Sequence, residues 1–204
     1  MPSLASIRNK ATQYISKGEY EKAVKEYNKA LEVEPNDANT HNLLGEAYLK
    51  MGKREGAISE FEKALELYTK DAFYTNAIAV CRKMLRLDAD RAEVYRELGD
   101  LYGKQGLLGE AIGNLMEYSD RKRAAGDMDE VFKTYHKTID LMPKKTDIRM
   151  KLVDMYLAKE KTSEAVEELK KVREIFREQG KVDDADGIES RIEALVGTAE
   201  TVAP

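Results

Sequence analysis

The amino-acid sequence predicts an all-α fold, a solenoid of about eleven antiparallel helices. The first observation behind this prediction is a 54-residue period that occurs three times after a shorter opening stretch. Four sets of equivalent positions carry the period: Leu44, Leu98 and Leu152; Tyr48, Tyr102 and Tyr156; Ala57, Ala111 and Ala165; Ile58, Ile112 and Val166. The second observation is the helical spacing of the apolar residues, in a chain of 204 residues with four prolines and no tryptophan. Units repeated at such a period stack on one another, and each buries its apolar face only against its neighbours.

Composition excludes several classes of function. The net charge of -4 argues against a protein that neutralises nucleic-acid phosphates or lies on an anionic membrane, and no segment approaches the length needed to span a bilayer. Cys81 is the single cysteine, so an intramolecular disulfide and a thiolate metal cage are both excluded, and a reducing compartment fits best. The first ten residues hold no apolar run of signal-peptide length. We expect a cytoplasmic protein without a cofactor or a metal.

The first unit, residues 1–37, reads as two helices. Gly18 marks the turn between them, and the second helix ends near Pro35, because proline disfavours the helical conformation of the residue before it.

Three units of three helices follow, over residues 38–91, 92–145 and 146–196. In the first of them, the small Gly45 is expected to let the next helix approach closely. The middle helix, 54–70, must pack on helices at both sides, and the third helix covers 74–87. The last helix, 182–196, is polar enough to cap the array, and residues 197–204 read as a disordered tail.

The turn before each third helix carries a second prediction. Gly126 and Gly180 stand where a left-handed residue would end the middle helix, and Ala72 holds the same place in the first three-helix unit. A left-handed alanine would cost about 1 kcal/mol, so we expect this turn to have a different shape.

The signature of the repeats resembles that of a known family. Leu44, Gly45 and Tyr48 are followed by Ala57 and Phe61 at the spacing of tetratricopeptide repeats. The resemblance implies a right-handed superhelix and a protein that binds other proteins, as an adaptor or an assembly scaffold. The chain could alternatively be the regulatory repeat domain of a longer enzyme, and the full-length gene would decide between the two.

Catalytic residues are not evident. His41 and His136 have no second histidine or cysteine at metal-ligand spacing. We interpret His41 as a packing residue, His136 as facing solvent and Cys81 as a buried apolar residue. The sequence gives no basis for an enzyme.

Acidic residues recur after the leucine-glycine pair or its equivalent. Glu46, Asp100 and Asp154 lie on first helices, and the middle helices carry acids of their own: Glu66, Asp120 and Glu174. First helices line the concave groove of tetratricopeptide proteins, so the resemblance implies that the first three face inward, with Asn42 and Arg96 on the same wall. The hypothesis is an anionic groove for a basic peptide or helix. The alternative is a solvated helix face with no special role.

Phe73 is the last candidate for a contact with a partner. Its equivalents, Asp127 and Lys181, are charged, so the architecture does not demand an aromatic residue there. Phe73 is either an exposed anchor for a partner or a filler of space at the altered turn.

Overall fold

The computed structural model describes residues 3–202, with side chains described up to residue 197. Every regular element among these residues is an α-helix, so the all-α prediction is confirmed for residues 3–202. The helices of this part of the chain are α1 (Leu4–Ser16), α2 (Tyr20–Val33), α3 (Ala38–Lys50), α4 (Arg54–Lys70), α5 (Tyr74–Leu87), α6 (Ala92–Lys104), α7 (Leu108–Ala124), α8 (Met128–Leu141), α9 (Thr146–Ala158), α10 (Thr162–Glu178) and α11 (Val182–Val202).

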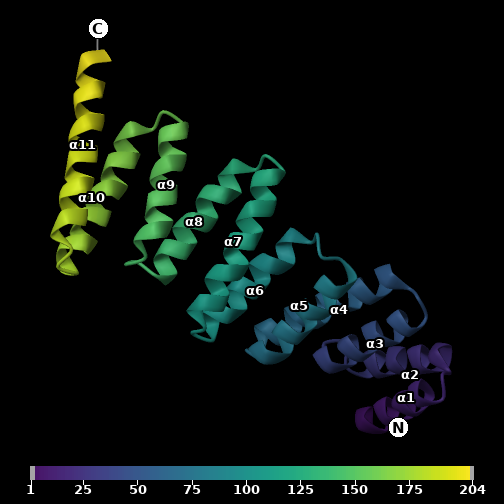
Figure 1. Cartoon of the computed structure of the whole chain (residues 1–204). Coiled ribbons are helices and arrows are strands. Elements are labelled where there is room, and N and C mark those ends of the chain that lie inside the picture. Colours follow the sequence, from purple (N-terminus) through teal and green to yellow (C-terminus); the bar gives the residue numbers. More distant parts are fainter. Residues whose placement is uncertain (1–2, 203–204) are drawn as a thin grey trace. The chain divides into compact units, whose positions relative to one another are not determined.

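The chain forms two compact units, Met1–Asn114 and Leu115–Pro204, and the boundary between them falls within α7. In the first unit α1 packs on α2, α2 on α3, α3 on α4, α4 on α5, and α5 on α6. In the second unit α8 packs on α9, α9 on α10, and α10 on α11. Figure 1 shows that consecutive helices within each unit reverse direction. Packing between neighbours in the chain is the arrangement of a helical repeat array.

The repeat signature supplies the core. Tyr27, Leu44 and Phe61 are fully buried in the first unit, as are Leu152 and Leu169 in the second. Each helix therefore presents one apolar face to a neighbour, and that burial offsets the conformational entropy lost on folding.

The packing around Gly45 shows why the repeat signature has a glycine at this position. A Cβ atom at this position would lie 2.7 Å from Cε1 of Phe61 and 3.1 Å from the carbonyl oxygen of Ala57. The close approach expected from the sequence is thus confirmed, because α4 crosses α3 where a larger side chain would collide with it.

The turn at Ala72 corrects one expectation. Ala72 has φ 59°, in the left-handed region that Gly126 (φ 80°) and Gly180 (φ 71°) occupy. The amide of Phe73 donates to the carbonyl of Tyr68 at 2.8 Å, and the turns at the two glycines close with equivalent bonds of 2.9 Å. The expected difference in shape is therefore wrong: alanine adopts the glycine conformation at an energetic cost.

The end of the last helix is a second difference. Helix α11 continues to Val202, so the predicted disordered tail is wrong for residues 197–202, and residues 203–204 lie outside the described chain. Gly197 costs only about 1 kcal/mol relative to alanine inside a helix, so it does not by itself end one. Thr198, Ala199 and Glu200 follow it without a proline.

Candidate functional site

Two of the acids predicted to line a groove, Glu46 and Asp154, have basic partners. Lys83 on α5 donates to Oδ1 of Asn42 at 2.8 Å and forms an ion pair with Glu46. On α11, Nη2 of Arg191 lies 2.9 Å from Oδ1 of Asp154. Both ion pairs join residues 37 apart in sequence, and they tie α3 to α5 and α9 to α11.

These ion pairs make two of the predicted binding residues less available to a partner. Glu46 and Asp154 do not present unpaired negative charge, because a base of the same unit neutralises each of them. Sequence reasoning missed the basic partners, although a signal existed: positions 83, 137 and 191, spaced at the repeat period, hold Lys, Lys and Arg. A role of Glu46, Asp100 and Asp154 in a common groove stays a prediction.

Phe73 lies at the N-terminal end of α5 with 58% of its surface exposed. Its ring meets the edge of Tyr68 at 6.5 Å between centroids. Because the turn at Ala72 has the same form as the glycine turns, filling an altered turn does not explain Phe73. A role of Phe73 as an exposed anchor for a partner stays a prediction.

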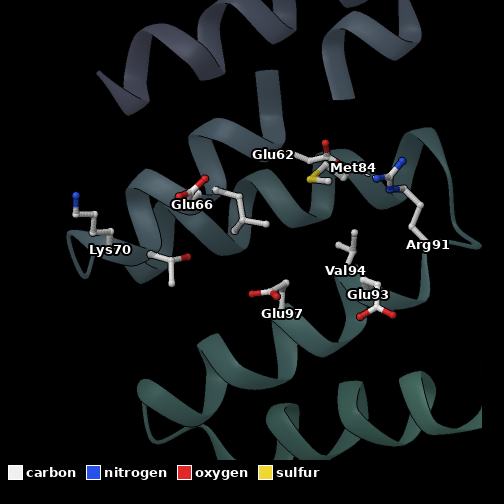
Figure 2. A pocket seen from close by; sticks show the side chains of 10 residues that line it. Glu62, Glu66, Lys70, Met84, Arg91, Glu93, Val94 and Glu97 are labelled. Carbon is white, nitrogen blue, oxygen red and sulfur yellow. Dashed lines mark hydrogen bonds and ion pairs between the residues drawn. The ribbon is translucent and has the colours of Figure 1, made fainter. Parts of the chain in front are cut away.

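An open cavity of about 510 Å³ lies between α4, α5 and α6, and we call it the α4–α6 cleft. Its apolar floor consists of Leu65, Met84 and Val94, which are all buried. Figure 2 shows Val94 and Glu97 projecting from α6 toward α4 and α5. The remaining lining residues are Glu62, Glu66, Thr69, Lys70, Arg91 and Glu93.

Some charged side chains at the cleft form ion pairs with one another, and others do not. Arg91 forms an ion pair with Glu62. Arg96, one of the sequence candidates, lies beside the cleft and pairs with Glu93 at 3.2 Å and with Glu97 at 3.4 Å. Within residues 3–197, Glu66 makes no ion pair, so its carboxylate is open to a guest. The sequence had marked Glu66 only as one of the recurring acids on middle helices.

Thr69 adds a polar atom to the wall of the cleft. Its Oγ1 is buried and has no hydrogen-bond partner in the described part of the chain. A buried hydroxyl without a partner is unfavourable for the stability of the fold.

A related cavity occurs in the second unit, with a different charge pattern. It measures about 410 Å³ and is lined by residues of α7, α8 and α9 that include two acids, Asp120 and Asp154, and two bases, Arg123 and Lys151. Asp120, Arg123 and Lys151 stand one repeat after Glu66, Thr69 and Glu97. The shared architecture therefore does not require the acidic character of the first cleft.

The buried polar groups of the two units serve the fold. Nδ1 of His41 lies 2.6 Å from Oε2 of Glu60, and Nε2 of His41 lies 2.9 Å from the carbonyl oxygen of Pro35. Two repeats later Arg149 takes the place of His41, with Glu168 at 2.6 Å and the carbonyl of Pro143 at 3.0 Å. His41 is thus buried, as its interpretation as a packing residue requires, and it fills the place of a structural cation.

The two remaining candidates for chemistry lie where the sequence suggested. His136 is exposed, and its Nε2 lies 3.0 Å from the hydroxyl of Tyr156. Cys81 is fully buried, and burial, with a contribution from the negative charge of Glu97, raises the pKa of its thiol to about 12. Among the described residues, no group of three or more acids, histidines or cysteines is placed to hold a metal ion. No helix of residues 3–202 is both long and apolar enough to cross a membrane.

Two family models match the N-terminal part of the chain. One, described as a TPR repeat, matches residues 11–52, and the other, described as a tetratricopeptide repeat, matches residues 38–71. No curated protein matches the chain.

Several solved structures are distantly similar. MamA from Desulfovibrio magneticus RS-1 is 21% identical, with 86% of this chain and 96% of that chain covered and a TM-score of 0.31. YrrB, described as a TPR protein with an unusual peptide-binding site, is 20% identical over 91% of this chain and 92% of that chain, with a TM-score of 0.32. A thermophilic TPR protein from Thermus thermophilus is 18% identical over 76% of this chain and 100% of that chain, with a TM-score of 0.29.

At these scores the solved structures carry no argument about a partner. The identification rests on the two family models and on the residues they cover, where Leu44, Gly45, Tyr48, Ala57 and Phe61 build the packed hairpin of α3 and α4. Residues 11–71 of the chain are therefore identified as tetratricopeptide repeats.

Proposed function

We propose that this protein is an adaptor or assembly scaffold that holds a segment of a partner protein in the α4–α6 cleft. The proposal is supported by the match of residues 11–71 to tetratricopeptide repeats, a class of repeat whose stacked helices leave an extended surface for binding other proteins. The single observation that carries the proposal is the open cavity of about 510 Å³ with an apolar floor. A cavity of this size is within the range of about 300–1,000 Å³ that is usual for binding sites.

The cleft is a better candidate than the groove first inferred from the acids of the first helices. Lys83 and Arg191 compete with any guest for Glu46 and Asp154, whereas Glu66 has no such competitor in the described chain. Apolar floor and polar rim together also match the anatomy of protein interfaces, in which a desolvated centre is surrounded by polar groups.

Closing the cleft tests the proposal. Thr69→Arg places in the cleft the residue that the next repeat carries as Arg123, so the architecture can accommodate it. The tagged wild-type protein and the variant are each used to capture partners from a lysate of the source cell, and mass spectrometry compares the bound proteins. A partner that binds the wild type and is lost from Thr69→Arg supports the proposal.

Thr75→Arg is the matched control. Thr75 is exposed on α5 and does not line the cleft, so this variant should keep the partner. Circular dichroism establishes that both variants are folded. Equal capture by the wild type and by a folded Thr69→Arg protein would show that binding does not use the cleft.

A further inference from the structure

We propose, on the basis of the proposed function, that the guest of the α4–α6 cleft is a basic side chain, a lysine or an arginine that the partner segment inserts between α4 and α6. The chemistry of the lining residues supports this class of guest over an apolar or an acidic one.

The charge of the cleft is the first argument. Its lining holds four carboxylates, from Glu62, Glu66, Glu93 and Glu97, against two bases, Lys70 and Arg91. Arg96 beside the cleft pairs with Glu93 and Glu97, so the net surplus is one negative charge. Arg91 is engaged with Glu62, and Figure 2 shows Lys70 at the outer end of the cleft. A cation that enters therefore meets Glu66 without displacing a base of the protein itself.

The floor of the cleft is the second argument. Leu65, Met84 and Val94 offer an apolar surface beneath the carboxylates. Lysine and arginine have the matching construction, because an aliphatic stem carries a charged end and the stem can be buried while the charge stays at a polar rim. A small inorganic cation would leave this floor unfilled.

Hydrogen bonding supplies the third argument. Lysine and arginine are donors without an acceptor, and the carboxylate of Glu66 at the cleft has no ion-pair partner among residues 3–197. A guest ammonium or guanidinium group can donate to this carboxylate, and hydrogen bonds between charged groups are stronger than neutral ones.

Comparison between the repeats shows that the stacking of helices does not impose this charge. The residues one period later hold two acids, Asp120 and Asp147, and three bases, Arg123, Lys145 and Lys151, which gives a surplus of one positive charge. Lys151 stands where the first cleft has Glu97. The fold therefore accepts a net negative or a net positive charge at these positions. Of the two sets of equivalent residues, only the α4–α6 cleft has a net negative charge.

Small probes test the class of guest directly. The isotope-labelled full chain is titrated by NMR with propylguanidinium and n-butylammonium, which reproduce the ends of arginine and lysine. Matched titrations use n-butanol (neutral), butyrate (anionic) and methylguanidinium, which has the charge without the stem. We expect the two long cations to shift the amide signals of Glu66, Thr69, Val94 and Glu97, with affinities about tenfold above those of the other probes.

Two variants complete the test. Glu66→Gln combined with Glu97→Lys, the residue of the next repeat, should weaken the response to the long cations by about tenfold or more. Asp120→Asn, at the equivalent of Glu66 in the second unit, should leave it unchanged. Equal binding of n-butanol or methylguanidinium, shifts spread over the whole surface, or an undiminished response in the double variant would each overturn the proposal.

The two proposals can fail separately. If Thr69→Arg abolishes partner capture but the long cations do not bind, the adaptor function stands and the basic guest is wrong. If the cations bind in the cleft but Thr69→Arg captures the partner normally, the cation site stands and the partner docks elsewhere.

Discussion

Two residues adopt a left-handed backbone conformation that their repeat equivalents reserve for glycine. Ala72 (φ 59°) corresponds to Gly126 and Gly180, and Glu160 (φ 58°) corresponds to Gly52 and Gly106. The left-handed conformation costs a residue with a Cβ atom about 1–2 kcal/mol. At these two positions the protein is therefore less stable than it would be with the glycine that the equivalent positions carry.

Ala72→Gly and Glu160→Gly should each raise the free energy of unfolding. The relief of strain exceeds the entropy that glycine adds to the unfolded chain, so we expect a net gain of about 0.5–1 kcal/mol for each variant. Urea denaturation followed by circular dichroism measures the gain. The control is Ala79→Gly on the exposed face of α5, which should lose about 1 kcal/mol. Lower stability of both turn variants would contradict the interpretation.

Cys81 should be chemically inert in the native protein. Because burial raises the pKa of its thiol to about 12, almost no thiolate is present at mildly alkaline pH. An aromatic disulfide reagent should therefore leave native Cys81 unmodified and react with it once urea unfolds the chain. A cysteine at exposed Thr75, in a Cys81→Ser background, should react at once in the native protein. Rapid modification of native Cys81 would show that α5 opens readily.

At the scale of helices, polar side chains fix which elements meet. The ion pair of Lys83 with Glu46 joins α5 to α3, and that of Arg191 with Asp154 joins α11 to α9. The buried pair of Arg149 and Glu168 joins α9 to α10, and Arg149 also donates to the carbonyl of Pro143. Burying an ion pair costs desolvation energy, but removing one partner would leave an uncompensated charge.

Glu168 should make the stability of the second unit depend on pH. Burial acts to raise the pKa of Glu168, but hydrogen bonds from Lys171 and Arg149 outweigh it and hold the pKa below its ordinary value of 4.5. The folded state therefore favours the carboxylate. Its stabilising contribution is complete above the unfolded pKa and is lost as pH falls through the lowered folded value.

Comparison with Glu168→Gln tests this dependence. We expect the variant to be less stable than the wild type at neutral pH, with the difference in unfolding free energy shrinking below about pH 4.5. Urea denaturation over a series of pH values measures it. Glu167→Gln, on the exposed face of the same helix, serves as the control and should differ little at any pH. A difference that grows on acidification would reverse the assigned sign.

At the scale of the whole molecule, the acidic surface should make partner binding sensitive to salt. The chain carries a net charge of -4, and the α4–α6 cleft adds a local surplus of negative charge. Because the Debye length falls from about 10 Å at 0.1 M salt to about 3 Å at 1 M, we expect captured partners to elute as salt is raised. Capture from lysate with low-salt and high-salt washes measures this.

Phe73 is the residue to test if partner binding does not depend on salt. A partner that survives the high-salt wash would indicate that apolar contacts dominate, and the exposed Phe73 is the first residue to examine. In that case Phe73→Ala should reduce capture without lowering the stability of the protein. Lower stability with unchanged capture would instead show that the contact with Tyr68 is its main role.

The helical architecture follows from sequence patterns alone. Periodic apolar positions require helices, and a constant period requires that each helix stack on its neighbours, so Leu44, Gly45 and Phe61 predicted both the elements and their close packing. The same local reasoning placed Cys81 in the core and His136 at the surface. Such properties follow from short-range patterns, which a single chain displays directly.

Which charged residues are free to bind a partner depends on how the helices pack. Sequence spacing selected Glu46 and Asp154, but Lys83 and Arg191, each 37 residues away, reach back across a helix and neutralise them. The sequence did not distinguish Glu66 from the other acidic residues, because its place beside the cavity depends on the packing of α4, α5 and α6. The physical reason is that the free charge of a surface depends on partners brought together by packing, and residues distant in sequence supply those partners.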